Sequence, residues 1–198
     1  HERIYKMAQS MGISSDGGQT FGGIGSSPFG GGVHSDHHAL WINPDNPSEL
    51  LLGTDGGLYL SQDRSRTWRH VDALPLSQFY EISHDMEWPY NVYGGLQDNG
   101  TWRGPSRAPG GVQTKHWDLL FGGDGFHVFV DPGDPDYTYV EYQGGQLLRH
   151  HLSTGEIKQI MPLPEEGEED YRCNWNSPIH LSPSTPGTVY FEIGRAHV

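Results

Sequence analysis

Short, mainly apolar runs recur along the chain, and each run is bounded by a turn rich in Gly, Pro, Asp or Asn. A short apolar run between two turn signals is typical of a β-strand. In each recurrence two such strands flank a Pro- or Asp-bearing turn, and a Gly-rich turn with a third strand often follows. The segments lie at about 38–61, 78–104, 125–151 and 177–192.

The turns between these runs have the residue types that tight hairpins need. "NPDNP" and "DPGDP" combine Pro with Asp or Asn, which presets φ and ends a strand, while "DGG", "DNG" and "QGG" supply positive φ. The residues in equivalent places, 41, 46 and 51 positions apart, are Leu51, Val92, Thr138 and Val189.

A unit of three or four antiparallel strands with a period of roughly 45 residues is typical of a β-propeller, whose blades are small sheets around a channel. The sequence therefore predicts an all-β fold, a fragment of a β-propeller with about three to four blades of antiparallel strands. The blade segments are expected at about 1–30, 38–71, 78–107, 125–160 and 177–192.

One octapeptide occurs twice, as "SSDGGQTF" at 14–21 and "SQDRSRTW" at 61–68. We expect its Asp to accept hydrogen bonds from turn N–H groups, its Ser and Thr to tie the sides of the turn, and its aromatic residue to pack between sheets. Ser65 replaces a Gly, so the second turn is expected to be more strained. The residues assigned this structural role are Ser14, Asp16, Gly18, Thr20 and Phe21, and Ser61, Asp63, Thr67 and Trp68.

The composition supports the all-β prediction and narrows the partners. The chain has 28 Gly, 14 Pro and 12% aromatic residues, whereas only 19% are charged. Its net charge is −13, and no run of Lys or Arg is present, so a nucleic acid is not expected as a partner. No apolar run approaches the ~20 residues of a membrane-spanning helix. The single cysteine, Cys173, excludes an internal disulfide, and the Gly-rich "GGIGSS" lacks the context of a phosphate cradle, so no cofactor is expected.

Both ends are expected to be cut. The first residue is His, so a signal peptide would not be visible, and the tail "IGRAHV", residues 193–198, resembles a translated sequencing adapter. We therefore expect one partial propeller domain at 1–192 followed by a non-native tail.

The repeated octapeptide resembles the Asp-box, or BNR motif, of sialidases, xyloglucan-type glycoside hydrolases and sortilin-like receptors. With "YGGLQDNGTWRGPS", "GGDGF" and "NWNSPI", the chain resembles a bacterial branch of sortilin-like and glycoside-hydrolase-family-74-like propellers over nearly all of 1–192. The resemblance implies a longer secreted or periplasmic protein that contains the remaining blades. It does not choose a chemistry, because this fold serves enzymes and receptors alike.

Polar residues concentrate in the loops that precede the innermost strands and in the turns between second and third strands, which share one face of a propeller. Asp-box turns lie on the other face. We predict that the polar loops ring one end of the channel and form the ligand face. Their residues are His34, Asp36, His37, Asp55, Gln97, Asp98, Asn99, Asp124, Glu141, Gln143, Asn174, Trp175 and Asn176.

Several of these residues have two interpretations. Asp36, Asp98 and Asp124 are the candidate catalytic acids, although Asp98, like Asp55, lies in a tight turn where Asp commonly bonds its own backbone. "HSDHH" contains metal-ligand types, but no further ligand motif follows, so no metal is expected. Trp175, like Trp102 and Trp117, either stacks on a sugar ring or fills the gap between sheets.

Two functions remain open at this stage, and so does the question of whether the protein is an enzyme. A glycoside hydrolase acting on a β-glucan or xyloglucan-like polysaccharide would use two of the carboxyl groups on the ligand face. A non-catalytic, sortilin-like propeller would instead bind a peptide or protein. The amides of Gln97, Asn99, Asn174 and Asn176 suit the second function, because amides bind without a particular protonation state.

Overall fold

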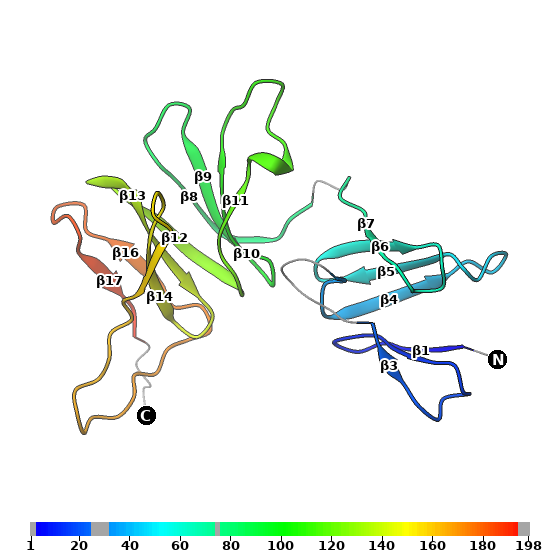
Figure 1. Cartoon of the computed structure of the whole chain (residues 1–198). Helices are drawn as coiled ribbons and strands as arrows, with labels where there is room; N and C mark the ends of the chain where they lie inside the picture. The colour runs from blue at the N-terminus through cyan, green and yellow to red at the C-terminus, as the bar shows by residue number, and fades with distance from the viewer. Residues whose placement is uncertain (1–2, 25–31, 74–75, 194–198) are drawn as a thin grey trace. The chain divides into compact units, whose positions relative to one another are not determined.

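The computed structural model describes residues 3–24, 32–73 and 76–193, and almost all regular structure in these ranges is β-strand (Figure 1). The strands are β1 Ile4–Lys6, β2 Gly12–Ser14, β3 Gly22–Gly23, β4 His37–Ile42, β5 Leu50–Thr54, β6 Gly57–Ser61, β7 Arg69–His70, β8 Phe79–His84, β9 Asn91–Leu96, β10 Gly100–Pro105, β11 Asp118–Phe121, β12 Gly125–Asp131, β13 Asp134–Tyr142, β14 Gln146–His151, β15 Glu156–Gln159, β16 Ile179–Leu181 and β17 Val189–Phe191. One helical turn, the 3-10 turn η1 Thr114–His116, precedes β11. No helix in the described ranges has the length and apolar character required to cross a membrane.

The strands form five antiparallel sheets in which neighbours along the chain are neighbours in the sheet. Three sheets have four strands, β4–β7, β8–β11 and β12–β15, while β1–β3 and β16–β17 are smaller. The predicted equivalent residues all lie on the second strand of their sheets, namely Leu51, Val92, Thr138 and Val189. Successive up-and-down sheets of this size are the blades of a propeller, so the fold is all-β and the chain is a propeller fragment.

A β-bulge recurs near the start of the first strand in each four-stranded sheet. It lies between His37 and Ala39 in β4, between Phe79 and Glu81 in β8, and between Gly125 and Val128 in β12. A bulge takes a residue out of the ladder and bends the strand. The repeat is thus present in the local irregularities of the sheets as well as in their strand count.

The chain divides into two compact units, His1–Leu76 and Ser77–Val198. In the first unit, Leu50 and Leu52 on β5 are completely buried. In the second, Tyr93, Leu120, Val128 and Val140 form a core between sheets β8–β11 and β12–β15. A second cluster joins sheet β12–β15 to β16–β17 through three buried side chains, Tyr139, Leu147 and Ile179.

Glycine brings two backbones of the second unit into contact where these sheets meet. A Cβ added to Gly95, on β9, would lie 2.1 Å from the carbonyl carbon of Gly125, at the start of β12. A Cβ on Gly125 would in turn lie 2.4 Å from Oγ1 of Thr101. Any larger residue at either position would push the strands apart, so this pair sets how closely the loop before β12 approaches the β9–β10 turn.

The sheet boundaries differ from the predicted segments at one place. The third segment was expected to end near residue 107, but its sheet continues to Phe121, because the fourth strand, β11, follows a long connection that contains η1. Residues 25–31, part of the first predicted segment, and 194–198, most of the predicted adapter-derived tail, lie outside the described residues.

Candidate ligand-binding site

Three of the predicted polar loops converge on Asp124 in the second unit. Oδ1 of Asp124 accepts a hydrogen bond from the backbone N–H of Asp98 at 2.8 Å, and Oδ2 accepts one from the indole Nε1–H of Trp175 at 2.8 Å. The backbone N–H of Asp124 donates to Oε1 of Gln143 at 2.7 Å. We call these four residues the Asp124 cluster. It joins the β9–β10 turn, the loop before β12, the β13–β14 turn and the segment before β16.

The local sequence explains how Asp124 reaches this position. Gly123, which precedes it, has φ of 82° and lies so close to Gln143 that an added Cβ would be 2.5 Å from Oε1. The carbonyl of Gly123 accepts the N–H of Gly100 at 2.8 Å. A left-handed residue and a close contact therefore occur together, and glycine satisfies both requirements.

The carboxylate of Asp124 orients its neighbours. Because each of its oxygens accepts a hydrogen bond, one from a backbone amide and one from an indole, the group fixes Asp98 and Trp175 relative to each other. The negative charge of the two carboxylates also acts on Tyr80. Burial is the main cause that raises the pKa of Tyr80, and the carboxylates of Asp124 and Asp98 raise it further. This arrangement suits the positioning of a ligand surface.

Trp175 lies on the surface, whereas the other two candidate tryptophans are partly buried. The side chain of Trp175 is 62% exposed, yet its indole N–H is held by Asp124 and its carbonyl accepts the N–H of Gly144 at 2.9 Å. Trp102 donates to the carbonyl of Asn99 at 2.5 Å, and Trp117 packs on Gly104 so closely that an added Cβ would lie 2.4 Å from its ring. Of the three, Trp175 is the one available to a ligand.

The predicted amides lie in the same loops as the Asp124 cluster, but they differ in hydrogen bonding and in exposure to solvent. Oε1 of Gln97 accepts from Gln78 at 2.7 Å, and Nδ2 of Asn99 donates to the carbonyl of Gln97 at 2.8 Å. Asn174 is exposed, whereas Oδ1 of Asn176 is buried and has no hydrogen-bond partner within the described chain. Asn174 is therefore the amide beside Trp175 that faces solvent.

Glu141 is not part of the open surface, contrary to the sequence prediction. Its side chain on β13 is 0% exposed, and Oε1 accepts the backbone N–H of Ser177 at 3.1 Å. Burial raises the pKa of this carboxyl group to about 7. The prediction followed the turn to which Glu141 belongs, but Glu141 is on the last part of β13, where its side chain is buried. The equivalent positions on β5 and β9 are Gly53 and Gly95.

The two predicted ligand-binding histidines are packed inside the first unit. His34 is 3% exposed and His37 is 5% exposed, and Nε2 of His37 hydrogen-bonds the carbonyl oxygen of His34 at 2.8 Å. The ring of His34 lies against Gly56, where an added Cβ would be 2.4 Å from it. Burial lowers the pKa of His37. These contacts give both residues a role in packing this loop.

The candidate acids fall into two groups. In the first unit, Asp36 has φ of 60° and accepts a hydrogen bond from Ser35 at 2.8 Å, and Asp55 pairs with His38 at 2.5 Å. In the second unit, Asp98 and Asp124 are joined directly. The ring of all predicted residues around one channel stays a prediction. Among the described residues, no group of three or more His, Cys, Asp or Glu side chains is placed to hold a metal ion.

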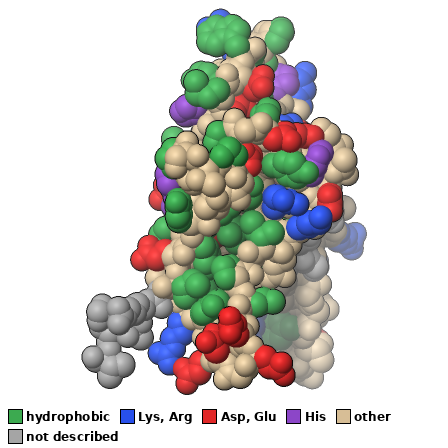
Figure 2. Space-filling view, turned by 90° about the vertical axis from the view of Figure 1, so that its left-hand side faces the viewer, with side chains coloured by type: hydrophobic (Ala, Val, Ile, Leu, Met, Phe, Trp, Pro, Cys, Tyr) green, Lys and Arg blue, Asp and Glu red, His purple; other side chains and the backbone are tan. Residues whose placement is uncertain are grey.

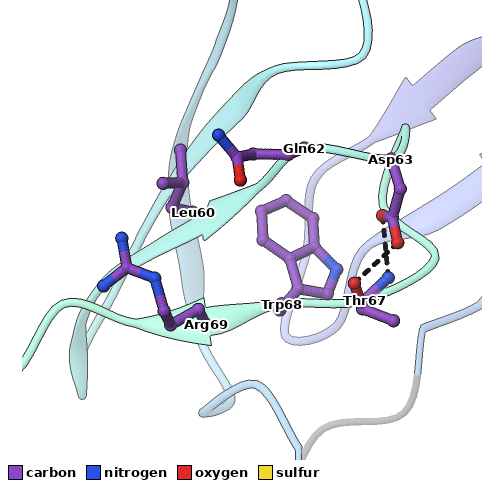
Figure 3. A pocket seen from close by; sticks show the side chains of 6 residues that line it. All are labelled: Leu60, Gln62, Asp63, Thr67, Trp68 and Arg69. Atoms are coloured by element: carbon purple, nitrogen blue, oxygen red, sulfur yellow. Dashed lines mark hydrogen bonds between the residues drawn. The ribbon is translucent and has the colours of Figure 1, made fainter.

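The two octapeptide turns, 14–21 and 61–68, which we call the first and second box, have the hydrogen bonds of a turn staple. Oδ1 of Asp63 accepts the N–H groups of Arg66 and Thr67, each at 2.9 Å, and Oδ2 accepts Oγ1–H of Thr67 at 2.6 Å (Figure 3). Asp16 accepts the matching bonds from Gln19 and Thr20. The hydrogen bond from the threonine side chain is the largest cause that lowers the pKa of each aspartate, to about 2 for Asp63.

The aromatic residues of the boxes are less buried than predicted. Phe21 is 44% exposed, so it does not fill a gap between sheets within the described chain. Trp68 is half-buried and lines a hollow of ≈ 210 Å³ with Leu60, Gln62 and Arg69; its indole reaches across the hairpin toward Gln62 (Figure 3). Both residues pack on their own hairpins.

The surface of the second unit has a mixed character. The face seen in Figure 2 shows hydrophobic side chains in patches, with acidic and basic side chains interspersed among them rather than gathered into a stripe of one charge. Exposed aromatic residues of this unit include Trp88 and Tyr190 in addition to Trp175. A test of Trp175 therefore has an exposed tryptophan, Trp88, as its internal control.

No family model matches the sequence, and neither does any curated protein. Among solved structures, the GH74 xyloglucanase from Xanthomonas campestris is 18% identical, with 95% of this chain and 32% of that chain covered and a TM-score of 0.37. The Niastella koreensis GH74 enzyme is 16% identical, with coverage of 96% and 32% and a TM-score of 0.41. AztD from Citrobacter koseri is 14% identical, with coverage of 96% and 64% and a TM-score of 0.39. The chain spans about a third of the two GH74 enzymes.

Proposed function

We propose that the Asp124 cluster is the binding face of a polysaccharide-binding propeller, with Trp175 as the surface on which a sugar ring stacks. The observation that carries this proposal is the fixed orientation of an exposed indole. Trp175 is held at its side-chain nitrogen by Asp124 and at its carbonyl by Gly144, although 62% of the side chain faces solvent. An aromatic side chain fixed before binding loses little conformational entropy when a ligand arrives.

The polar groups around Trp175 favour a neutral saccharide. Exposed Asn174 offers a donor and an acceptor beside the indole, and a sugar hydroxyl group is likewise both donor and acceptor. The net charge of −13 opposes an anionic ligand. A neutral β-glucan or xyloglucan-like chain fits these conditions, and such a ligand would place the whole protein in a secreted or periplasmic setting.

We assign binding, rather than hydrolysis, to the Asp124 cluster. Glycoside hydrolysis requires two carboxyl groups with separate acid and base or nucleophile roles. Both oxygens of Asp124 already accept hydrogen bonds that orient Asp98 and Trp175. Hydrolysis by Asp98 and Asp124 in the longer parent protein is a second proposal, and Asp36 lies in the other unit.

The test is calorimetric binding of β-glucan and xyloglucan oligosaccharides to the 198-residue chain, with a reducing-sugar assay on the same samples. Trp175→Ala is expected to weaken binding roughly tenfold or more, because stacking is lost, while Trp175→Phe retains most of the affinity. Trp88→Ala is the matched control, since Trp88 is an 84% exposed tryptophan of the same unit outside the cluster.

Equal losses for Trp175→Ala and Trp88→Ala, or no saccharide binding at all, would overturn the proposal. Saturable binding of peptides without saccharide binding would favour the sortilin-like alternative. Release of reducing sugar that disappears in Asp98→Asn would instead support the hydrolytic proposal.

A further inference from the structure

We infer that Glu141 is a positioning residue for Trp175, and that the protonation state of Glu141 controls how firmly the segment 173–177 is fastened to the second unit. The role in ligand binding rests on the proposed function, whereas the fastening itself does not. Glu141 is completely buried on β13, so it is not itself part of the exposed ligand-binding surface.

The first step of the argument is the contact between Glu141 and the segment. Oε1 of Glu141 accepts the backbone N–H of Ser177 at 3.1 Å, across the junction between sheet β12–β15 and the start of β16. The backbone of His127 also hydrogen-bonds this carboxyl group. His127 lies in the bulge between Gly125 and Val128, which frees its N–H from the strand ladder.

The second step connects Ser177 to Trp175. The hydroxyl of Ser177 donates to the carbonyl of Asn174 at 3.2 Å, so Ser177 fixes both ends of the short turn that contains Trp175. The segment is also fastened by the bond from the N–H of Gly144 to the carbonyl of Trp175 and by the bond from the indole of Trp175 to Asp124. Loss of the Glu141 anchor would leave these two hydrogen bonds to hold Trp175 among the described residues.

The third step is the incomplete satisfaction of the buried carboxyl group. Oε2 of Glu141 is buried and has no hydrogen-bond partner in the described part of the chain. None of the ion pairs found among the described residues includes Glu141. A buried carboxylate without a cation is costly, and the neutral acid is the form that such a site prefers.

The titratable groups around Glu141 do not reverse this preference. From the segment itself, Cys173 faces Glu141, and burial followed by the charge of Glu141 raises the pKa of the thiol. From β12, His127 contributes its backbone N–H, while burial lowers the pKa of its imidazole and Glu81 is its charged neighbour. Neither residue supplies a positive charge to Glu141 at neutral pH.

The direction of the pH dependence follows from the raised pKa of Glu141. In an opened segment the carboxyl group would ionise near its ordinary value of 4.5, and in the closed structure it ionises at about 7. The extra stability of the closed segment is therefore complete below the lower value, falls as the pH rises between the two, and is constant above the upper one. Between pH 5 and pH 8 we expect the opened fraction to rise roughly seventyfold.

The test is NMR hydrogen exchange of the Ser177 amide in the ligand-free chain between pH 5 and pH 8, corrected for intrinsic exchange. The reference is the Gly100 amide, which donates to the carbonyl of Gly123 where sheet β8–β11 meets the loop before β12. At that place the residue equivalent to Glu141 is Gly95, which has no carboxyl group. Protection of Ser177 is expected to fall roughly seventyfold and that of Gly100 to stay constant. Glu141→Gln, which keeps the acceptor and has no charge, is expected to abolish the pH dependence of Ser177.

A pH-independent Ser177 amide in the unchanged chain would overturn the inference without any variant, and so would a pH dependence that survives in Glu141→Gln. Saccharide affinity measured over the same pH range gives the second readout: it is expected to fall toward pH 8 as the closed fraction of the segment falls. A pH-dependent Ser177 amide with no saccharide binding would leave the fastening intact and defeat the proposed function. Saccharide binding together with a pH-independent protection of Ser177 would support the proposed function and defeat the inference about Glu141.

Discussion

The two octapeptide boxes of the first unit, 14–21 and 61–68, have the same hydrogen bonds on different backbones. In the first box the residues in the left-handed region are Gly17 and Gly18, with φ of 75° and 92°. In the second box the equivalent positions are Arg64 and Ser65, with φ of 61° and 67°. Left-handed φ costs a non-glycine residue about 1 kcal/mol or more. The side-chain staple therefore determines the turn strongly enough to hold two unfavourable residues in it.

The boxes also differ in how their aromatic residue is packed. Phe21 is 44% exposed, while Trp68 is half-buried against Leu60 and Gln62 of its own hairpin. The more strained turn is thus the one with the better-packed aromatic side chain. We infer that packing of Trp68 offsets the backbone strain of Arg64 and Ser65, and three pairs of substitutions test this comparison.

The largest effect is expected for Trp68→Ala, which should lower the free energy of unfolding by about 2 to 3 kcal/mol, less than for a fully buried tryptophan. Phe21→Ala is its counterpart and should cost about 1 kcal/mol, because nearly half of that side chain is already in water. Urea denaturation of the 198-residue chain measures both. Equal costs would show that the two aromatic residues contribute alike and that packing does not offset strain in the second box.

A smaller effect is expected for Ser61→Ala. Oγ of Ser61 accepts the N–H of buried Ser65 at 2.9 Å and donates to Asp63 at 2.9 Å. Its removal leaves a buried donor unsatisfied, and we expect a loss of about 1 to 2 kcal/mol. Ser14→Ala is the matched change, since Ser14 accepts the N–H of Gly18 at 2.8 Å. It should cost less, because Gly18 is more exposed than Ser65; a larger loss in the first box would contradict this account.

The smallest effects are expected when a glycine is introduced into the second box and one is removed from the first. Arg64→Gly should stabilise the chain by about 0.5 kcal/mol, because glycine relieves the left-handed strain but has a more flexible unfolded state. Gly17→Ala should destabilise by a similar amount, and it introduces no clash, since nothing lies within 4 Å of the added Cβ. Changes of the same sign in thermal unfolding experiments would refute the assignment of strain to the second turn.

Much of the fold followed from the sequence because turn chemistry and alternation are local. The spacing placed Leu51, Val92 and Thr138 on the second strands of three sheets. The end of the third sheet was missed because the connection between β10 and β11 contains η1 and interrupts the repeat. A strand that follows such a connection has no turn signal to locate it.

The candidate site was predictable in part for a related reason. Loop position alone brought Asp98, Asp124, Gln143 and Trp175 into one set, and the structure joins them by hydrogen bonds. The burial of Glu141 was not predictable, because alternation tells which side of a strand a residue occupies but not what the next sheet places there.

The bulge shared by β4, β8 and β12 has a consequence for anyone who shortens or recombines these sheets. Each first strand contains a residue that its partner strand does not match. Deletion of the unmatched residue in β12 would leave Val128 opposite Val140 but would remove the local bend of the strand, and so change the direction in which the loop with Asp124 enters it. A recombinant blade built from this chain must therefore keep the unmatched residue, or the loop before its first strand will be displaced.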